Sequence, residues 1–137
     1  MTRVLLDTGF LVALFHPSDR LRKHARDWLL ANRHPLVTAA PVIVETCFFL
    51  DAAAKGKLLE WVQRDALSVS EVPVGAYADI TRILRKCADR KIDFADAALV
   101  WLANQTGVRG ILTVDEADFA VYRLKGGKRF ELVKWYE

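Results

Sequence analysis

The sequence has 137 residues, of which 53% are hydrophobic and 27% are charged, and this composition is typical of a folded globular protein rather than a disordered one. The length predicts one domain over residues 1–137, and the apolar runs are far too short to span a membrane. The formal net charge of +3 mildly favours an anionic partner such as nucleic acid, more so if several carboxylates are gathered in one site.

The first predicted strand is the apolar run Val4–Leu6, which stops at Asp7. No signal-peptide layout precedes it, so we expect a cytoplasmic protein. An apolar run that ends at a carboxylate is typical of a buried parallel strand, and open α/β sheets place their sites at that edge. Asp7 either caps the helix predicted over Phe10–Phe15 or serves as a ligand at the strand tip, and its position leaves both interpretations open.

The next predicted helix is capped by Ser18 and runs to about Arg33, with apolar side chains on one face and basic side chains over much of the rest. We interpret the basic face as solvated, and contact with phosphate is the less favoured alternative. A short strand is expected over Leu36–Thr38. Pro41 then suits the first turn of a helix that continues to Leu50.

Glu45 is the only charged residue between Pro41 and Leu50. A lone carboxylate on so apolar a helix is usually paired, because an unpaired one would lose its ionisation or destabilise the fold. We therefore favour a functional role for Glu45. Cys47, on the same helix, and Cys87 form no metal-type cluster and are predicted to be free, buried thiols.

Further along the chain, Gly56 is expected to break the helical pattern before a helix over Leu58–Leu67. Alternating residues over Ser68–Val72 predict a strand. From Val74 to about Arg90, an apolar stripe at helical spacing predicts a helix that packs on the core.

A buried helix is predicted to begin after Asp93 and to end at Gly107, and it carries two carboxylates at its start. Asp93 precedes the apolar run and is expected to cap it, while Gly107 is expected to form the C-cap. Asp96 lies between Ala95 and Ala97, and its charge would be very costly to bury alone. Asp96 therefore needs a hydrogen-bond donor or a cation.

The run Ile111–Val114 has the same pattern as the first strand, because it is mostly apolar and is followed by a carboxylate, Asp115. Residues Phe130–Lys134 are predicted to form an edge strand. Strands alternate with helices throughout, and this order predicts an α/β fold with a mostly parallel sheet covered on both sides.

The predicted topology brings Asp7 and Asp115 to one edge of the sheet, with Glu45 and Asp96 on helices that could pack over it. Four converging carboxylates would repel one another without a cation, and all-oxygen ligands suit Mg²⁺ or Mn²⁺. The sequence offers no Ser-His-Asp set, no P-loop and no glycine-rich dinucleotide motif. We therefore predict an acidic, metal-dependent site that hydrolyses a phosphodiester.

The order and spacing of these acids resemble those of PIN-domain ribonucleases, in particular the VapC-type toxins of type II toxin–antitoxin systems. The resemblance covers essentially the whole chain. Each local signature is weak alone, but the four in order are specific: Leu6–Gly9, Glu45 in an apolar helix, Asp93–Leu99 and Ile111–Asp115.

The resemblance implies a PIN-like three-layer α/β/α sandwich whose site uses Mg²⁺, with Mn²⁺ able to substitute. It implies that the catalytic, metal-binding residues are Asp7, Glu45, Asp96 and Asp115. Thr8 and Thr113 match supporting positions, and Asp93 and Asp118 are interpreted as caps or supports.

The resemblance further implies an endoribonuclease that cleaves single-stranded or loop RNA through metal-activated water. It implies a homodimer and an inhibitory antitoxin protein whose tail occupies the groove. Apolar residues available for the dimer contact include Phe48, Phe49 and Trp101.

Two other functions remain open. The chain could be a PIN-fold RNA-processing nuclease without an antitoxin, or a non-catalytic α/β module that binds protein or RNA, with its acids serving as caps and ion-pair members. A phosphoryl-accepting receiver domain is less favoured, because the sequence places neither its late Lys nor its middle-strand Asp well. RNA cleavage that needs metal and Asp96 would separate the nucleases from the other classes.

Overall fold

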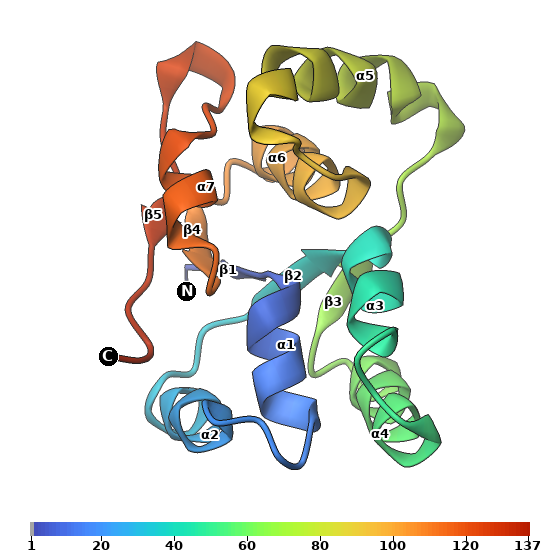
Figure 1. Cartoon of the computed structure of the whole chain (residues 1–137), viewed down its shortest axis with the longest axis vertical. Coiled ribbons are helices and arrows are strands. Elements are labelled where there is room, and N and C mark those ends of the chain that lie inside the picture. The colour runs from blue at the N-terminus through green and yellow to red at the C-terminus, as the bar shows by residue number, and fades with distance from the viewer. Residues whose placement is uncertain (1) are drawn as a thin grey trace.

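The computed structural model describes residues 2–137, which form one sheet with helices on both faces (Figure 1). All strand pairs in the sheet are parallel, and the strand order is β3-β2-β1-β4-β5. The strands are β1 (Val4–Leu6), β2 (Leu36–Ala39), β3 (Ser68–Ser70), β4 (Gly110–Leu112) and β5 (Glu131–Leu132). The predicted α/β sandwich with a parallel sheet is confirmed.

The central strands are buried because their side chains are apolar on both faces, as a parallel sheet covered by helices requires. Leu5 of β1 pairs with Val37 on one side and with Ile111 on the other, and all three side chains are buried. The edge strands β3 and β5 are short and more exposed. The prediction of an edge strand near residue 131 is confirmed, although only Glu131–Leu132 pair as a strand.

Helices cover the sheet in two layers, with α1 to α4 below it and α5 and α6 above it in Figure 1. The helices are α1 (Thr8–Phe15), α2 (Arg22–Ala31), α3 (Ala40–Cys47), α4 (Ala52–Gln63), α5 (Tyr77–Lys86), α6 (Phe94–Thr106) and α7 (Glu116–Val121). Short 3-10 turns flank α5 and follow α7, at Val74–Ala76, Ala88–Arg90 and Lys125–Gly127. Among them, α6 is apolar on every side, and the run Ala95–Ala103 is buried throughout.

The caps of α6 match the sequence predictions. Asp93 accepts a hydrogen bond from the backbone N–H of Asp96 at 2.8 Å, and Gly107 ends the helix with a left-handed φ of 76°. This N-cap fixes the first turn of α6, and with it the backbone of Asp96.

The strand order reverses between β1 and β4. The chain passes from β1 to β2 and β3 on one side of the sheet, and then crosses to β4 on the other side of β1. In open parallel sheets, the connections that leave two such strands part at their carboxyl ends and form a crevice. Asp7 follows β1 and Thr113 follows β4, so both lie at this crevice.

Several predicted helix boundaries are wrong: α3 ends at Cys47 and not at Leu50, α4 ends at Gln63 and not at Leu67, and α5 spans only Tyr77–Lys86 between two 3-10 turns. Two further errors have a clear physical reason. Ser18 does not cap α2, because the helix begins at Arg22 and the side chain of Asp19 instead accepts a hydrogen bond from the backbone N–H of Leu21. Gly56 does not break a helix but lies inside α4, which Asp51 caps through the backbone N–H of Ala54. A helix tolerates an internal glycine at a cost of about 1 kcal/mol when its other residues favour helix.

Trp101 was expected to be available for a dimer contact, and this prediction is wrong because its side chain lies in the core with 9% exposure. Phe48 and Phe49 are 80% and 57% exposed, as that prediction requires. Cys47 and Cys87 are free, as predicted, but half-buried rather than buried. Over residues 2–137, no helix is long and apolar enough to cross a bilayer.

Candidate active site

Asp7 lies at the carboxyl end of β1 with 1% of its surface exposed. One of its oxygens, Oδ2, accepts a hydrogen bond from the hydroxyl of Thr113 at 2.7 Å. The other, Oδ1, is buried and has no hydrogen-bond partner among residues 2–137. Although Asp7 stands at the N-cap position of α1, its side chain makes no capping bond there. The structure therefore does not support the cap interpretation and leaves a buried carboxylate oxygen to be explained.

Thr113 is held in place from two directions. Its hydroxyl accepts a hydrogen bond from the backbone N–H of Asp115 at 2.9 Å, and its carbonyl accepts one from the indole of Trp135 at 3.1 Å. This bonding fixes the hydroxyl that donates to Asp7. The supporting position implied for Thr113 therefore has a physical basis, because one side chain orients Asp7 and the backbone of Asp115 together.

Asp96 lies in the first turn of α6 with 9% exposure, and its Oδ2 accepts a hydrogen bond from the hydroxyl of Tyr122 at 3.0 Å. The sequence predicted that Asp96 needs a partner but did not identify Tyr122. Tyr122 follows α7, 26 positions along the chain, and only the packing of its ring in the core brings it there. No spacing pattern links the two residues.

Glu45 lies on α3 and is half-buried, as its isolation in an apolar helix suggested. Its Oε1 accepts a hydrogen bond from the hydroxyl of Thr8 at 2.6 Å, which ties α3 to the start of α1. Thr8 follows Asp7 directly in the chain. The bond therefore places Glu45 beside the end of β1, as the predicted convergence requires.

Asp115 is exposed at the start of α7, and the chain approaches α1 closely at this point. A Cβ atom built on Gly9 would lie 2.3 Å from Cγ2 of Val114, so the contact between α1 and the segment after β4 depends on a glycine. Asp118, one turn further along α7, forms an ion pair with Arg90 at 3.0 Å. This ion pair is consistent with the interpretation of Asp118 as a supporting residue rather than a metal ligand.

The carboxylates share one electrostatic environment. Burial raises the pKa of Asp7 to about 7. The hydrogen bond from Thr113 opposes this rise, and repulsion from Asp115 and Glu45 adds to it. Burial also raises the pKa of Asp96 to about 8, and repulsion from Asp7 adds to it. The pKa values of Glu45 and Asp115 are likewise raised, first by burial. Charge repulsion thus links Asp7 with Asp115, Glu45 and Asp96, and the use of all four acids in one site stays a prediction.

The chemistry of this group suits a hard divalent cation. All available side-chain donors are oxygens, and the unpartnered Oδ1 of Asp7 is the kind of atom that a cation would satisfy. Within residues 2–137, however, no three acidic, His or Cys side chains form a compact group able to hold a metal ion. Glu45 and Asp115 are the more accessible of the four acids. The residue types therefore fit a metal ion, although these side chains do not form a complete coordination shell.

Two cavities adjoin the acids, one on each side of Glu45. The Arg20 cavity has a volume of about 430 Å³ and is lined by Thr8, Gly9, Val12, Asp19, Arg20, Leu21, Glu45, Phe49, Val114 and Asp115. The Phe48 cavity has a volume of about 530 Å³ and includes Ala40, Pro41, Val44, Glu45, Phe48, Tyr77, Asp93 and Phe94. Among residues 2–137, Arg20 is the only cationic residue that lines either cavity.

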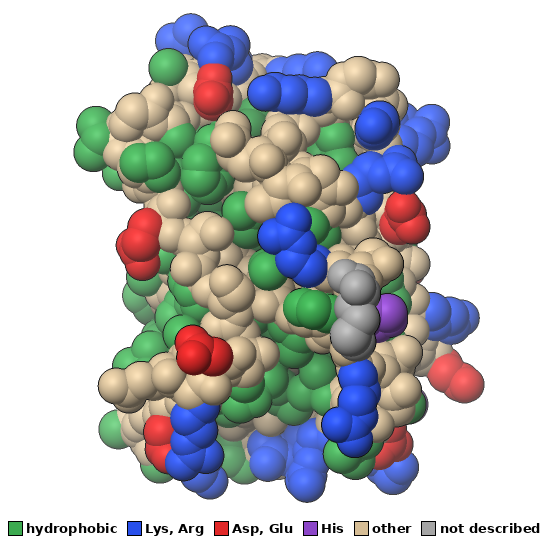
Figure 2. Space-filling view, turned by 180° about the vertical axis from the view of Figure 1, so that it is seen from behind, with side chains coloured by type: hydrophobic (Ala, Val, Ile, Leu, Met, Phe, Trp, Pro, Cys, Tyr) green, Lys and Arg blue, Asp and Glu red, His purple; other side chains and the backbone are tan. Residues whose placement is uncertain are grey.

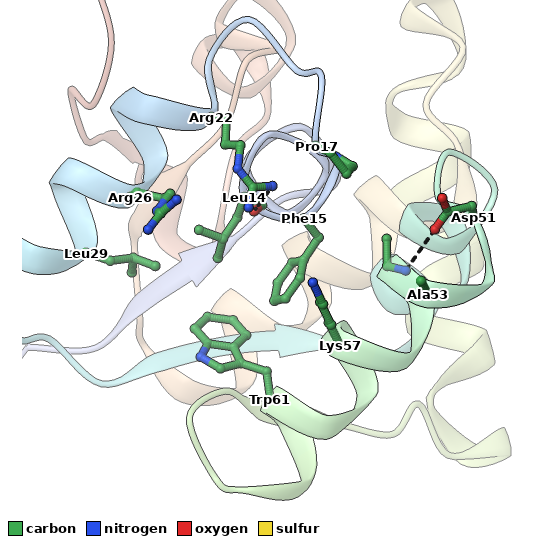
Figure 3. A pocket seen from close by; sticks show the side chains of 11 residues that line it. Leu14, Phe15, Pro17, Arg22, Arg26, Leu29, Asp51, Ala53, Lys57 and Trp61 are labelled. Carbon is green, nitrogen blue, oxygen red and sulfur yellow. Dashed lines mark hydrogen bonds between the residues drawn. The ribbon is translucent and has the colours of Figure 1, made fainter.

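A third cavity lies at the other end of α1, between α1, α2 and α4, with a volume of about 290 Å³. Figure 3 shows Arg22, Arg26 and Lys57 around the aromatic rings of Phe15 and Trp61. These rings make an edge-on contact with centroids 5.5 Å apart. This Trp61 cavity therefore has an apolar wall and a basic rim, and it contains none of the four candidate acids.

Basic side chains are widely distributed over the rest of the surface. On the face turned away from the viewer of Figure 1, Lys and Arg side chains extend from one end of the molecule to the other and are not gathered into one patch (Figure 2). On this face, the basic side chains that the net charge predicted are scattered and produce a weak positive potential over a wide area. Such a potential attracts nucleic acid without selecting a sequence.

Comparison with known proteins agrees with the predicted resemblance. The family model described as the PIN domain matches residues 4–124. The chain is 26% identical to Ribonuclease VapC26 of Mycobacterium tuberculosis over 134 residues, which cover 95% of this chain and 99% of that protein.

Two solved structures share the fold. VapC20 of Mycobacterium tuberculosis, described as a sarcin–ricin loop cleaving toxin, superposes with a TM-score of 0.75 at 18% identity, over 84% of this chain and 93% of the other. A toxin–antitoxin complex from Klebsiella pneumoniae contains a chain with a TM-score of 0.61 at 19% identity, over 98% of each chain.

Proposed function

The chain belongs to the PIN domain family, and we propose that it is a metal-dependent endoribonuclease that acts as the toxin of a toxin–antitoxin pair. The observation that carries this proposal is the buried carboxylate of Asp7 at the crevice, one oxygen of which has no hydrogen-bond partner among the described residues, and its charge repulsion with Asp115, Glu45 and Asp96. The relatives support the class of substrate, because one is named a ribonuclease and another is described as cleaving the sarcin–ricin loop.

We assign metal binding to the same four acids, with Mg²⁺ as the expected ion and Mn²⁺ as a substitute. A divalent ion held there would supply a Lewis acid that activates water and stabilises the negative charge on the phosphate oxygens in the transition state. The side chains around it have separate tasks. Thr113 orients Asp7, Tyr122 orients Asp96 and Thr8 orients Glu45, so three of the four acids reach the crevice in fixed positions.

The proposed activity is tested by incubating the purified protein with a labelled RNA pool in Mg²⁺, in Mn²⁺ or in EDTA. We expect cleavage in either metal, none in EDTA, and a loss of at least about 100-fold in Asp96→Asn, because one ligand charge is removed. Asp27→Asn is the matched control, since Asp27 is exposed and pairs only with Lys23 on α2. Cleavage that persists in EDTA or in Asp96→Asn would contradict the proposed site.

We also propose an antitoxin partner whose tail occupies the groove at the acids, as the resemblance implies, and a further segment of which binds the Trp61 cavity. Its apolar wall of Phe15 and Trp61 and its basic rim suit a peptide segment that carries apolar and acidic side chains (Figure 3). The neighbour from a toxin–antitoxin complex supports the choice of partner. We expect the protein to co-purify with the product of an adjacent gene. Arg26→Glu should weaken this association, and Arg33→Glu should not. A chain without such a partner would instead be an RNA-processing nuclease.

The homodimer is proposed to form through α3 and the start of α5. Phe48 is 80% exposed and Val44 is 59% exposed, and both line the Phe48 cavity; Val74, in the 3-10 turn before α5, is 78% exposed. Exposed apolar side chains that lie together mark a contact surface. Light scattering should give twice the monomer mass for the parent protein and a smaller mass for Phe48→Glu. Leu30→Glu, on the exposed face of α2, should leave the mass unchanged.

A further inference from the structure

The Arg20 cavity combines the acids with a single cation. Its lining includes Thr8, Glu45 and Asp115 together with Arg20 and Phe49. An RNA strand whose scissile phosphate lies at the acids must place its next nucleotide in one of the two adjoining cavities. Of these, only the Arg20 cavity contains a charge that attracts phosphate.

The position of Arg20 is determined by the turn before α2. The side chain of Asp19 accepts a hydrogen bond from the backbone N–H of Leu21 at 2.9 Å, and its carbonyl accepts one from Arg22 at 3.1 Å. Leu21 is 8% exposed and anchors the turn in the core. The backbone of Arg20 is thereby held between two fixed residues.

The guanidinium of Arg20 remains available for a ligand. Arg20 is exposed and, within residues 2–137, forms no ion pair with any carboxylate, although its cavity is lined by acids. Arg90, the other arginine near the acids, is by contrast paired with Asp118. An arginine side chain binds phosphate through two parallel hydrogen bonds, so a free guanidinium at this place suits a phosphodiester.

Phe49 provides an aromatic surface in the same cavity. It follows α3, its backbone N–H donates to the carbonyl of Thr46 at 3.0 Å, and its side chain is 57% exposed. Val12 and Val114 give the cavity further apolar lining. Proteins that bind single-stranded RNA commonly stack its bases on exposed aromatic rings of this kind.

We propose that the Arg20 cavity binds the nucleotide adjacent to the scissile phosphate of a single-stranded RNA, with Arg20 on its phosphate and Phe49 on its base. This inference rests on the proposed nuclease function and adds a binding subsite to it. Arg20 and Phe49 are binding residues, because they hold the strand and do not touch the reacting phosphorus. A protein segment with a carboxylate for Arg20 is the competing occupant.

The inference is tested in the inactive Asp96→Asn background with a fluorescent single-stranded RNA that spans a site cut by the active protein. Arg20→Ala should weaken binding about tenfold and reduce the slope of log affinity against log salt by about one, because one phosphate contact is lost. Arg20→Lys should retain the slope but recover only part of the affinity. Phe49→Ala should weaken binding about tenfold with an unchanged salt slope, because base stacking carries no charge.

The matched controls are Arg33→Ala and Leu59→Ala, which remove an exposed charge and an exposed apolar side chain outside both cavities. Neither should change RNA binding. Equal RNA binding by Arg20→Ala and Arg33→Ala would overturn the inference, and so would an Arg20→Ala variant that loses only inhibition by a protein partner. If the active protein cuts no RNA in either metal, the proposed function itself fails, and that result is distinct from a failure of the subsite.

Discussion

The ionised form of Asp96 is stabilised by one hydrogen bond and destabilised by burial and by neighbouring negative charges. Burial and the charges of Asp7 and Asp93 raise its pKa to about 8, while the hydroxyl of Tyr122 acts in the opposite direction. A ligand for a cation must be ionised when the cation binds. Tyr122 therefore helps to keep Asp96 ionised near neutral pH, and the sequence contained no signal for this pair.

Tyr122→Phe removes the hydroxyl and leaves the ring in the core. Since the hydrogen bond favours the ionised form, we expect the pKa of Asp96 to rise further and Mn²⁺ binding to require a higher pH, by about one unit. Calorimetric titration with Mn²⁺ at several pH values, alongside thermal unfolding of each protein, measures the shift. An affinity that falls equally at every pH would show that Tyr122 acts only through the fold.

At the scale of elements, the sequence predicted most strands and helices because apolar periodicity and caps are local signals. The capping of α6 by Asp93 and Gly107 is an example. The start of α2 and the continuity of α4 through Gly56 were missed, because each depends on competing local preferences for helix and for turn, which apolar periodicity does not show. In α4, Ala52, Ala53 and Ala54 favour helix strongly enough to outweigh the glycine.

The two helical glycines, Gly9 and Gly56, are expected to respond to alanine in opposite ways. Gly56→Ala places its methyl group in open space and should stabilise the protein by about 0.5 to 1 kcal/mol through helix propensity. Gly9→Ala forces the methyl group against Val114 and should destabilise it by about 1 to 3 kcal/mol. Denaturant unfolding measures both.

Val114→Ala provides the control for the close contact at Gly9. In the double variant Gly9→Ala, Val114→Ala, much of the lost stability should return, because the clashing methyl groups are absent. A double-mutant cycle without coupling would mean that Gly9 has another role. The sequence predicted that Asp7 and Asp115 share one edge of the sheet, but it did not predict this close contact, because α1 and the segment after β4 are distant in the chain and meet through packing.

At the scale of the whole molecule, the fold gathers like charges at one edge of the sheet. The sequence predicted this gathering, because two apolar strands each end at or near a carboxylate and alternating strands and helices imply a parallel sheet. It predicted a buried helix around Asp96, but not the hydrogen bonds that Thr113 and Tyr122 donate to the buried Asp7 and Asp96, because these bonds depend on how distant segments pack around the two acids. That burial makes the stability of the protein sensitive to pH and to metal.

The raised pKa values of Asp7 and Asp96 fix the sign of this dependence. Both values lie above the ordinary 3.8, at about 7 and about 8, so the folded state binds more protons than the unfolded state between about pH 4 and pH 8. Stability is therefore fully present at low pH and is lost as the pH rises through the folded values. In the presence of EDTA, the free energy of unfolding should fall by about 2 kcal/mol or more between about pH 5 and pH 8.

Divalent metal should reverse this loss, because it binds the ionised carboxylates of the folded state only. Mn²⁺ is expected to raise the midpoint of thermal unfolding strongly near pH 8 and weakly near pH 5, since protons compete for the same oxygens at the lower pH. Asp96→Asn should flatten the pH dependence in EDTA and weaken the response to Mn²⁺, because it removes one of the two titrating carboxyls and its repulsion of Asp7. Thermal unfolding followed by circular dichroism at both pH values, with and without Mn²⁺, measures all of these effects. Stability in EDTA that rises with pH would contradict the burial of these two acids, and an equal response to Mn²⁺ in Asp96→Asn would remove that residue from the proposed metal ligands.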